Sequence, residues 1–179
     1  GMGRTGALFA YQQAGVAPDL LSAAKGIGNG FPLSALLATE HAASGMVPGS
    51  HGSTYGANPL AMAVGNAVLD VMLQPDFLHE VNARASYLRT QLQGLQDRYP
   101  DLVVDVRGAG LMLAIKLADG VDYRAFAHAL RHAGLLTAPA VAKQVIRLLP
   151  PLIVREAECD TAIDLLATQC EKEQQKEKA

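Results

Sequence analysis

The sequence contains no tryptophan, and aromatic residues make up only 5% of the chain. The aromatic platforms on which single-stranded nucleic acids stack are therefore scarce. Positive charge is not in excess either, since 15 Lys and Arg stand against 17 Asp and Glu and the formal net charge is −2. A nucleic-acid-binding surface needs clustered cationic residues. We therefore expect no nucleic-acid partner.

Cysteine is almost as rare, with only Cys159 and Cys170 in the chain. Two cysteines are too few for a disulfide framework, and their spacing is not that of a metal site. The sequence also has no charged segment followed by a short apolar one, as a secretion signal would have, and no apolar run long enough to cross a membrane. These absences predict a reduced, cytoplasmic protein with no membrane partner.

Half of the 179 residues are hydrophobic, which is enough for a sizeable core. This length fits one domain, or one domain and part of a second. The turn-forming segment 74–76 (QPD) separates two differently patterned regions, and we place a domain boundary there. The predicted domains are residues 1–74 and 75–179.

The first region predicts two strands, a short helix and a longer one. Segments 19–24 and 33–38 are apolar on both faces, as buried parallel strands are. Thr39 is expected to begin a brief helix that ends near Gly45. Asn58 followed by Pro59 is an N-cap with proline at the first helical position, which predicts a helix to about Leu73.

The second region alternates helices and strands, which is typical of an α/β or α+β domain. Apolar residues recur every three or four positions from Phe77 to Leu95, which predicts a long amphipathic helix closed at Tyr99-Pro100. The remaining expected elements are strands 102–106 and 111–117 joined by 107–110 (RGAG), helix 123–133, short strands 135–136 and 145–148, and helix 156–170. Residues 171–179 are a solvated helix end or a fraying terminus.

Lys25 stands out because it ends an apolar run and begins a loop with glycines at positions 26, 28 and 30. Partial burial at such a junction favours the neutral amine, which can attack a carbonyl group. The glycines let the backbone approach a flat ligand closely. The alternative is an ordinary loop lysine, and the pattern around Lys25 does not by itself decide between the two.

Residues 1–6 (GMGRTG) match the glycine spacing of a dinucleotide-binding fingerprint. That fingerprint requires a strand before it and a helix at its end. No strand precedes this segment and the apolar stretch after it is short, so we reject the nucleotide interpretation in favour of a glycine-rich turn.

Five segments in this order resemble the class III aminotransferases, which are pyridoxal-phosphate enzymes. They are residues 1–6 (GMGRTG), 17–32 (APDLLSAAKGIGNGFP), 49–59 (GSHGSTYGANP), 107–112 (RGAGLM) and 147–152 (RLLPPL). Among the subfamilies, residues 134–137 (GLLT) and 147–151 (RLLPP) most resemble acetylornithine/succinylornithine aminotransferases.

The resemblance implies an α/β fold of the PLP-dependent transferase type I (aspartate-aminotransferase-like). The chain would be the C-terminal part of the large cofactor-binding domain followed by the small domain. The implied reaction is PLP-dependent transfer of the terminal amino group of N-acetylornithine to 2-oxoglutarate, a step of arginine biosynthesis. The implied partners are these small molecules and a second copy of the chain, in a homodimer with shared active sites.

The resemblance also assigns roles to four residues. Lys25 would hold pyridoxal 5'-phosphate through its amine and later carry a proton from the substrate. Thr54 would bind the phosphate of the cofactor in the other subunit, and Ser53 would lie at the substrate, although either could instead simply cap a turn. Arg147 would clamp the substrate α-carboxylate, which suits a planar guanidinium, although an outward-facing strand arginine is the alternative. No role follows for His51, and Arg4 and Arg107 are expected to be structural partners of nearby loop carbonyls.

Parts of the family pattern lie upstream of Gly1 and are not in this sequence: the aspartate that holds the pyridine nitrogen, the phosphate loop and the stacking aromatic residue. We therefore expect a portion of a longer enzyme. Other class III ω-aminotransferases (4-aminobutyrate, ornithine or succinylornithine) remain alternatives, as does an inactive fragment or binding module. Asn29 and Ala57 stand where the family commonly has glycine, and asparagine tolerates positive φ.

Overall fold

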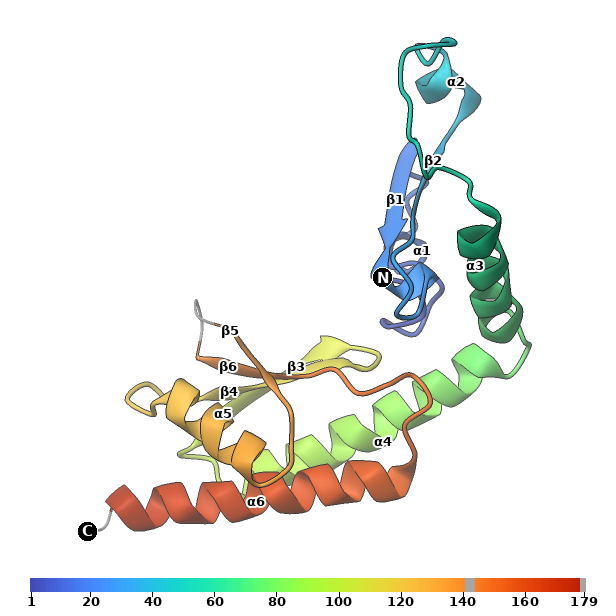
Figure 1. Cartoon of the computed structure of the whole chain (residues 1–179). Helices are drawn as coiled ribbons and strands as arrows, with labels where there is room; N and C mark the ends of the chain where they lie inside the picture. The colour runs from blue at the N-terminus through green and yellow to red at the C-terminus, as the bar shows by residue number, and fades with distance from the viewer. Residues whose placement is uncertain (141–143, 178–179) are drawn as a thin grey trace. The chain divides into compact units, whose positions relative to one another are not determined.

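The computed structural model describes residues 1–140 and 144–177. The chain divides into two compact units, Gly1–His79 and Glu80–Ala179. Figure 1 shows the elements of both units along the chain. The predicted domain boundary at residues 74–75 lies a few residues upstream of this division and stays a prediction.

The first unit is built around an antiparallel pair of strands, β1 (Leu20–Ala24) and β2 (Ser34–Ala38). Leu20 lies opposite Ala38 and Ala24 lies opposite Ser34. The prediction of buried parallel strands is wrong on both counts, because most residues of the two strands are exposed. Only residues 25–33 connect them, and a parallel pair needs a crossover of about a dozen residues or more.

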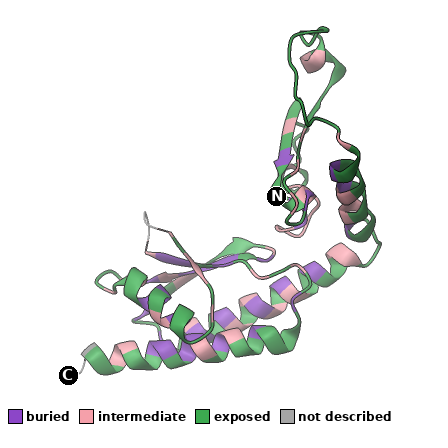
Figure 2. Ribbon diagram, in the orientation of Figure 1, coloured by how far each residue is buried: buried purple, intermediate pink, exposed green. Residues whose placement is uncertain are grey.

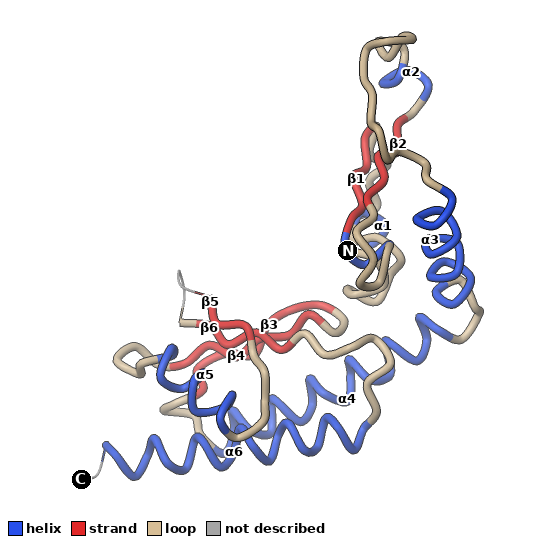
Figure 3. The backbone as a smooth tube through the Cα atoms, viewed as in Figure 1, coloured by secondary structure: helices blue, strands red, loops and turns tan. Residues whose placement is uncertain are grey.

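The helices of the first unit begin where the capping residues predict. The side chain of Thr39 accepts a hydrogen bond from Ala42 N at the start of α2 (Glu40–Ala43). The side chain of Asn58 accepts one from Ala61 N, at 2.9 Å, at the start of α3 (Pro59–Met72). The short helix α1 (Tyr11–Ala14) was not predicted, and its four residues carry no apolar period that could reveal it. A long loop joins α2 to α3 (Figure 3).

The second unit contains a four-stranded antiparallel sheet in the order β3-β4-β6-β5. Its strands are β3 (Val103–Ala109), β4 (Met112–Leu117), β5 (Ala138–Ala140) and β6 (Val145–Leu148). We expected residues 107–110 to connect two strands, but β3 continues to Ala109. The turn is therefore confined to Gly110 and Leu111. The strand predicted at 135–136 is not present there, and β5 begins at Ala138 instead.

Three helices complete this unit: α4 (Phe77–Arg98), α5 (Tyr123–His132) and α6 (Glu156–Glu177). α4 and α6 lie side by side (Figure 1), joined by an ion pair between Arg84 and Glu156 at 2.7 Å. The purple stripe along α4 in Figure 2 is the predicted apolar face, formed by Val81, Ala85, Leu88, Leu92 and Leu95. On β4, alternate residues Leu113, Ile115 and Leu117 are almost fully buried. The core of the unit therefore lies between this face of the sheet and its helices.

Both cysteines are free and buried in the second unit. Burial raises the pKa of the Cys170 thiol to about 12. Across the described ranges 1–140 and 144–177, no helix combines the length and hydrophobicity that a membrane crossing needs.

Candidate functional site

Lys25 directly follows β1 and is the first residue of the 3₁₀ turn η1 (Lys25–Ile27), where its backbone conformation is unusual. Its φ is +54°, in the left-handed region that non-glycine residues rarely occupy. The Lys25 carbonyl accepts hydrogen bonds from Gly28 N at 3.0 Å and Asn29 N at 3.1 Å. Strained residues of this kind concentrate at functional sites, where the surrounding structure fixes them. The loop therefore fixes the backbone position of Lys25 from which its side chain extends.

A hollow of about 500 Å³ opens beside this lysine. It is lined by Lys25, Gly26, Asn29, Gly30, Phe31, Pro32 and Leu33. The loop that forms it is too tight for a side chain at Gly28, since a Cβ there would lie 2.1 Å from the Phe31 carbonyl oxygen. The glycine loop thus shapes a concave surface next to a primary amine.

The Lys25 side chain is exposed, so the expectation of a half-buried lysine is wrong. The strands on either side of the loop leave most of their residues exposed, and they do not cover it. No carboxylate of the described residues lies within ion-pair distance of its Nζ atom. The amine is accessible, and within residues 1–140 and 144–177 no ion-pair partner holds it.

Ser53 and Thr54 lie in the loop between α2 and α3, just before the N-cap of α3. Both are exposed. The turn is closed by a hydrogen bond from Gly56 N to Ser53 O at 3.4 Å and by one from Asn58 Nδ2 to Tyr55 O at 2.9 Å. Neither Ser53 nor Thr54 lines the hollow beside Lys25. Within one chain, the structure does not bring these predicted site residues together.

Arg147 lies on β6 in the second unit and is exposed. Its Nε atom donates a hydrogen bond to the Ala138 carbonyl, at 3.1 Å, on the neighbouring strand β5. Among the described residues the two Nη atoms have no further acceptor, so one edge of the planar guanidinium is left for a carboxylate. The bond to Ala138 orients the group and limits its freedom.

Arg107 takes a different partner from the one predicted. It forms an ion pair with Asp105 at 2.6 Å, whereas the neighbouring carbonyl of Gly108, also on β3, accepts from Arg89 Nη2 at 2.5 Å. Burial lowers the pKa of the Arg4 guanidinium. Arg4 and Arg107 therefore both have structural partners. His51 is exposed in its loop.

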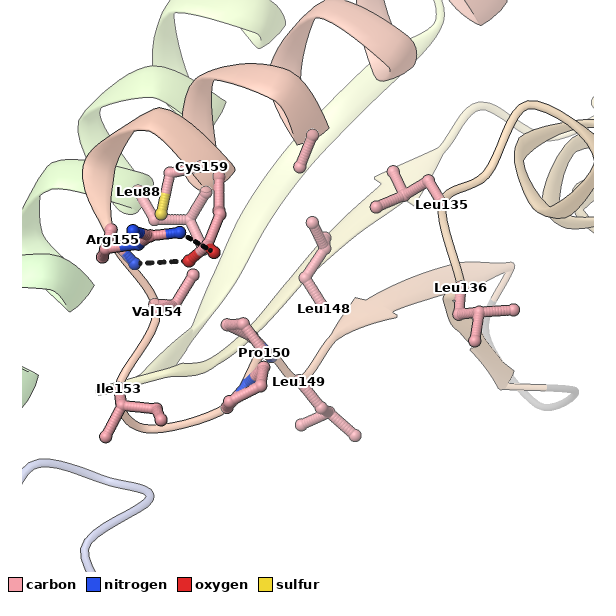
Figure 4. A pocket seen from close by; sticks show the side chains of 13 residues that line it. Leu88, Leu135, Leu136, Leu148, Leu149, Pro150, Ile153, Val154, Arg155 and Cys159 are labelled. Carbon is pink, nitrogen blue, oxygen red and sulfur yellow. Dashed lines mark hydrogen bonds and ion pairs between the residues drawn. The ribbon is translucent and has the colours of Figure 1, made fainter.

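The larger hollow of the second unit, about 680 Å³, is mainly apolar (Figure 4). Its lining includes Leu135, Leu148, Pro150 and Ile153, and its polar groups satisfy one another: Arg155 pairs with Glu158 through Nη2 and through its backbone N, both at 2.8 Å. Burial raises the pKa of the Cys159 thiol at its edge. With no reactive group free to act, this hollow is a poorer candidate for chemistry than the smaller one beside Lys25.

The sequence profile of the family described as "Aminotransferase class-III" matches residues 1–169. The chain belongs to the class-III aminotransferases. This family uses pyridoxal phosphate, and the resemblance inferred from five sequence segments is confirmed.

Curated class-III relatives include two acetylornithine aminotransferases. The protein of Mesorhizobium japonicum is 52% identical over 164 residues, covering 92% of this chain and 40% of the relative. The protein of Agrobacterium fabrum is 56% identical over 158 residues, covering 88% of this chain and 39% of the relative. The chain therefore spans about 40% of the length of the curated relatives that it matches.

Solved class-III structures confirm the predicted fold. The acetylornithine aminotransferase of Elizabethkingia anophelis has a TM-score of 0.86 at 34% identity, over 96% of this chain and 43% of that one. The ornithine aminotransferase of Toxoplasma gondii, whose active site holds PLP at partial occupancy, has a TM-score of 0.90 at 28% identity, over 100% of this chain and 43% of that one. The mixed α/β structure is that of part of these enzymes.

The residues around Lys25 fit a pyridoxal group. An aldehyde needs a reachable primary amine, and the Lys25 Nζ is exposed with no carboxylate of the described chain paired to it. A flat ring needs a surface without projecting side chains, and the adjoining hollow is bordered by Gly26 and Gly30. The family cofactor and the local geometry therefore agree on the same side chain.

Proposed function

We propose that this chain is part of an acetylornithine aminotransferase of the cytoplasm. The enzyme transfers the terminal amino group of N-acetylornithine to 2-oxoglutarate and serves arginine biosynthesis. The observation that carries this proposal is the identity of 52–56% to acetylornithine aminotransferases over about nine-tenths of the chain. The cofactor is pyridoxal 5'-phosphate.

Lys25 holds the cofactor and moves the proton. Its amine would hold the cofactor's aldehyde covalently, and the same amine, when free, would accept the proton from the substrate carbon. A bound pyridoxal phosphate draws electrons away from that carbon. Two features support this role: the left-handed backbone at Lys25 and the two hydrogen bonds to its carbonyl. Both fix the backbone position that carries the amine.

Arg147 binds the α-carboxylate that the amino acid and 2-oxoglutarate have in common. Its Nε bond to Ala138 presents the Nη edge in a fixed orientation, which favours two parallel hydrogen bonds to a carboxylate. A lysine at this position could supply the charge but not the paired geometry.

Thr54 binds the cofactor phosphate of a second subunit, and Ser53 contacts the substrate there. The support is geometric: both residues are exposed, and neither lines the hollow beside Lys25 of its own chain. The loop before a capped helix offers hydroxyl and backbone N–H donors to an anion. The enzyme is accordingly a homodimer with active sites shared across a two-fold interface.

The substrate is tested by comparing kcat/KM for N-acetylornithine, N-succinylornithine, ornithine and 4-aminobutyrate, each with 2-oxoglutarate, in the full-length protein. N-acetylornithine should give the highest value. Ornithine is the second candidate, because the Toxoplasma gondii enzyme matches the whole chain with a TM-score of 0.90. A preference for any other donor would refute the assigned substrate, and no turnover with any of them would refute the activity.

The role of Lys25 is tested by borohydride reduction of the cofactor-loaded protein, followed by peptide mapping. The label should appear on the peptide that contains Lys25, and Lys25→Ala should abolish transamination without unfolding the protein. Lys116→Ala is the matched control, because Lys116 lies in the second unit, where it forms an ion pair with Asp119 at 3.8 Å. Normal turnover in Lys25→Ala would remove the assignment.

A further inference from the structure

Two histidines on α5 lie close enough to act together. His128 and His132 are four positions apart, and their Nε2 atoms are 3.3 Å from each other. Their rings meet edge to face, with centroids 4.4 Å apart and planes inclined by 66°. Both side chains are exposed. Neither residue belongs to the site that is proposed for transamination.

The separation of the two nitrogens matches the bite of a tetrahedral metal ion. Zinc binds histidine nitrogen at about 2.0–2.1 Å, and the tetrahedral angle then places two such nitrogens about 3.3–3.4 Å apart. A square-planar ion would bring them to roughly 2.8–3.0 Å. The observed Nε2–Nε2 separation of 3.3 Å is that of the tetrahedral case, and the rings, whose centroids are 4.4 Å apart, would turn outward for both lone pairs to meet at the metal.

The close approach needs one proton or one cation between the rings. Two bare ring nitrogens repel, so in the metal-free protein the two Nε2 atoms share one hydrogen bond, and the tautomers decide which ring donates. When zinc takes that place, both rings carry their proton on Nδ1 and both Nε2 lone pairs point to the metal.

We propose that His128 and His132 form a bidentate zinc site on the surface of α5. In the described part of the chain no group of three or more His, Cys, Asp or Glu side chains could hold a metal, so water fills the remaining two positions. Arg124 and Arg131 on the same helix add positive charge nearby, and the chelate itself must therefore supply the affinity. The site is independent of the aminotransferase proposal.

A zinc ion bridging these two residues joins successive turns of α5. Because it binds only the folded helix with both nitrogens, zinc should raise the thermal stability of the protein, and the rise should grow with the logarithm of the zinc concentration once that exceeds Kd. The effect should depend on both histidines, since either one alone is a monodentate ligand.

The test is isothermal titration of Zn²⁺ into the metal-free full-length protein, with melting curves recorded with and without zinc. His128→Gln and His132→Gln should each lose one zinc per chain and the zinc-dependent rise in melting temperature. His79→Gln is the matched control, because His79 is an exposed helical histidine with no histidine four positions away, and it should behave like the wild type. Equal zinc stoichiometry in the wild type and both α5 variants would overturn the proposal, as would a wild type that takes up no zinc.

Discussion

Gly28→Ala should displace Lys25, the lysine proposed to hold the cofactor, although it removes none of the proposed site side chains. A Cβ added at Gly28 would lie 2.1 Å from the Phe31 carbonyl oxygen and 3.1 Å from Leu33 Cβ. Real Cβ atoms essentially never come within 3.0 Å of such atoms, so the backbone must open by the difference between 3.0 and 2.1, or at least about 0.9 Å. The φ of Gly28 is −102°, so the clash and not the backbone torsion causes the change.

The displacement reaches Lys25 through one hydrogen bond of Gly28, and a second bond ties Gly28 to Phe31, where the clash arises. Gly28 N donates to the Lys25 carbonyl at 3.0 Å, and the Gly28 carbonyl accepts from Phe31 N at 2.9 Å. Breaking one of these bonds costs about 1 kcal/mol. A misplacement of about 1 Å at a reacting group can cost about 10²-fold in rate, and we expect kcat to fall by about that factor.

The assay is steady-state transamination by the full-length protein, together with cofactor content and thermal melting. Gly45→Ala is the control, because a Cβ at Gly45, in the same unit, meets nothing within 4 Å. The control should keep its kcat. A Gly28→Ala variant with a kcat within twofold of the wild type would refute the argument that this turn positions Lys25.

Three further predictions concern the carboxylate clamp, the dimer and the core. Arg147→Ala should raise KM for the amino acid and for 2-oxoglutarate together, by the equivalent of roughly 2–3 kcal/mol; unchanged KM with a lower melting temperature would indicate a purely structural arginine. Mixing inactive Lys25→Ala and Thr54→Val proteins should restore activity, because one site of each hybrid dimer keeps both residues; hybrids without activity would contradict the cross-subunit role of Thr54. Burial raises the pKa of Cys170 from 9.0 to about 12, so the unfolded chain loses this proton first and the free energy of unfolding should fall between about pH 9 and pH 12. Cys170→Ala should remove that part of the slope in denaturant titrations, and an unchanged slope would contradict it.

Local signals in the sequence predicted the helices well because their causes are local. Asn58-Pro59 supplies its own cap and proline, and α3 begins at Pro59. The apolar period from Phe77 predicted α4, and the predicted face is buried.

Asn29 and Ala57 replace glycine in positions with φ of +43° and +53°, as the family pattern implies.

Strand pairing was predicted less well because it depends on partners distant in the sequence. Apolar residues on both faces suggested parallel strands at β1 and β2, yet the connection length, which was visible in the sequence, permits only the antiparallel return. β5 (Ala138–Ala140) contains a proline and has no alternating pattern, so only its pairing with β6 reveals it.

The candidate site residues were named from the sequence and stay predictions, whereas their surroundings could not be predicted. The motif around Lys25 located the amine, whereas its exposure depends on what the neighbouring strands leave uncovered. Likewise the spacing of His128 and His132 places them on one helical face, and only side-chain coordinates bring their Nε2 atoms to 3.3 Å.

The pairing of α4 with α6 also has a consequence for the order of events during synthesis. Arg84 and Tyr87 on α4 bind Glu156 and Asp160 on α6, which lie 72 and 73 positions later. At about 5–20 residues per second, the ribosome needs roughly 4–15 s to cover that distance. During this time neither of these two contacts can form, so α4 and the sheet have to fold without α6.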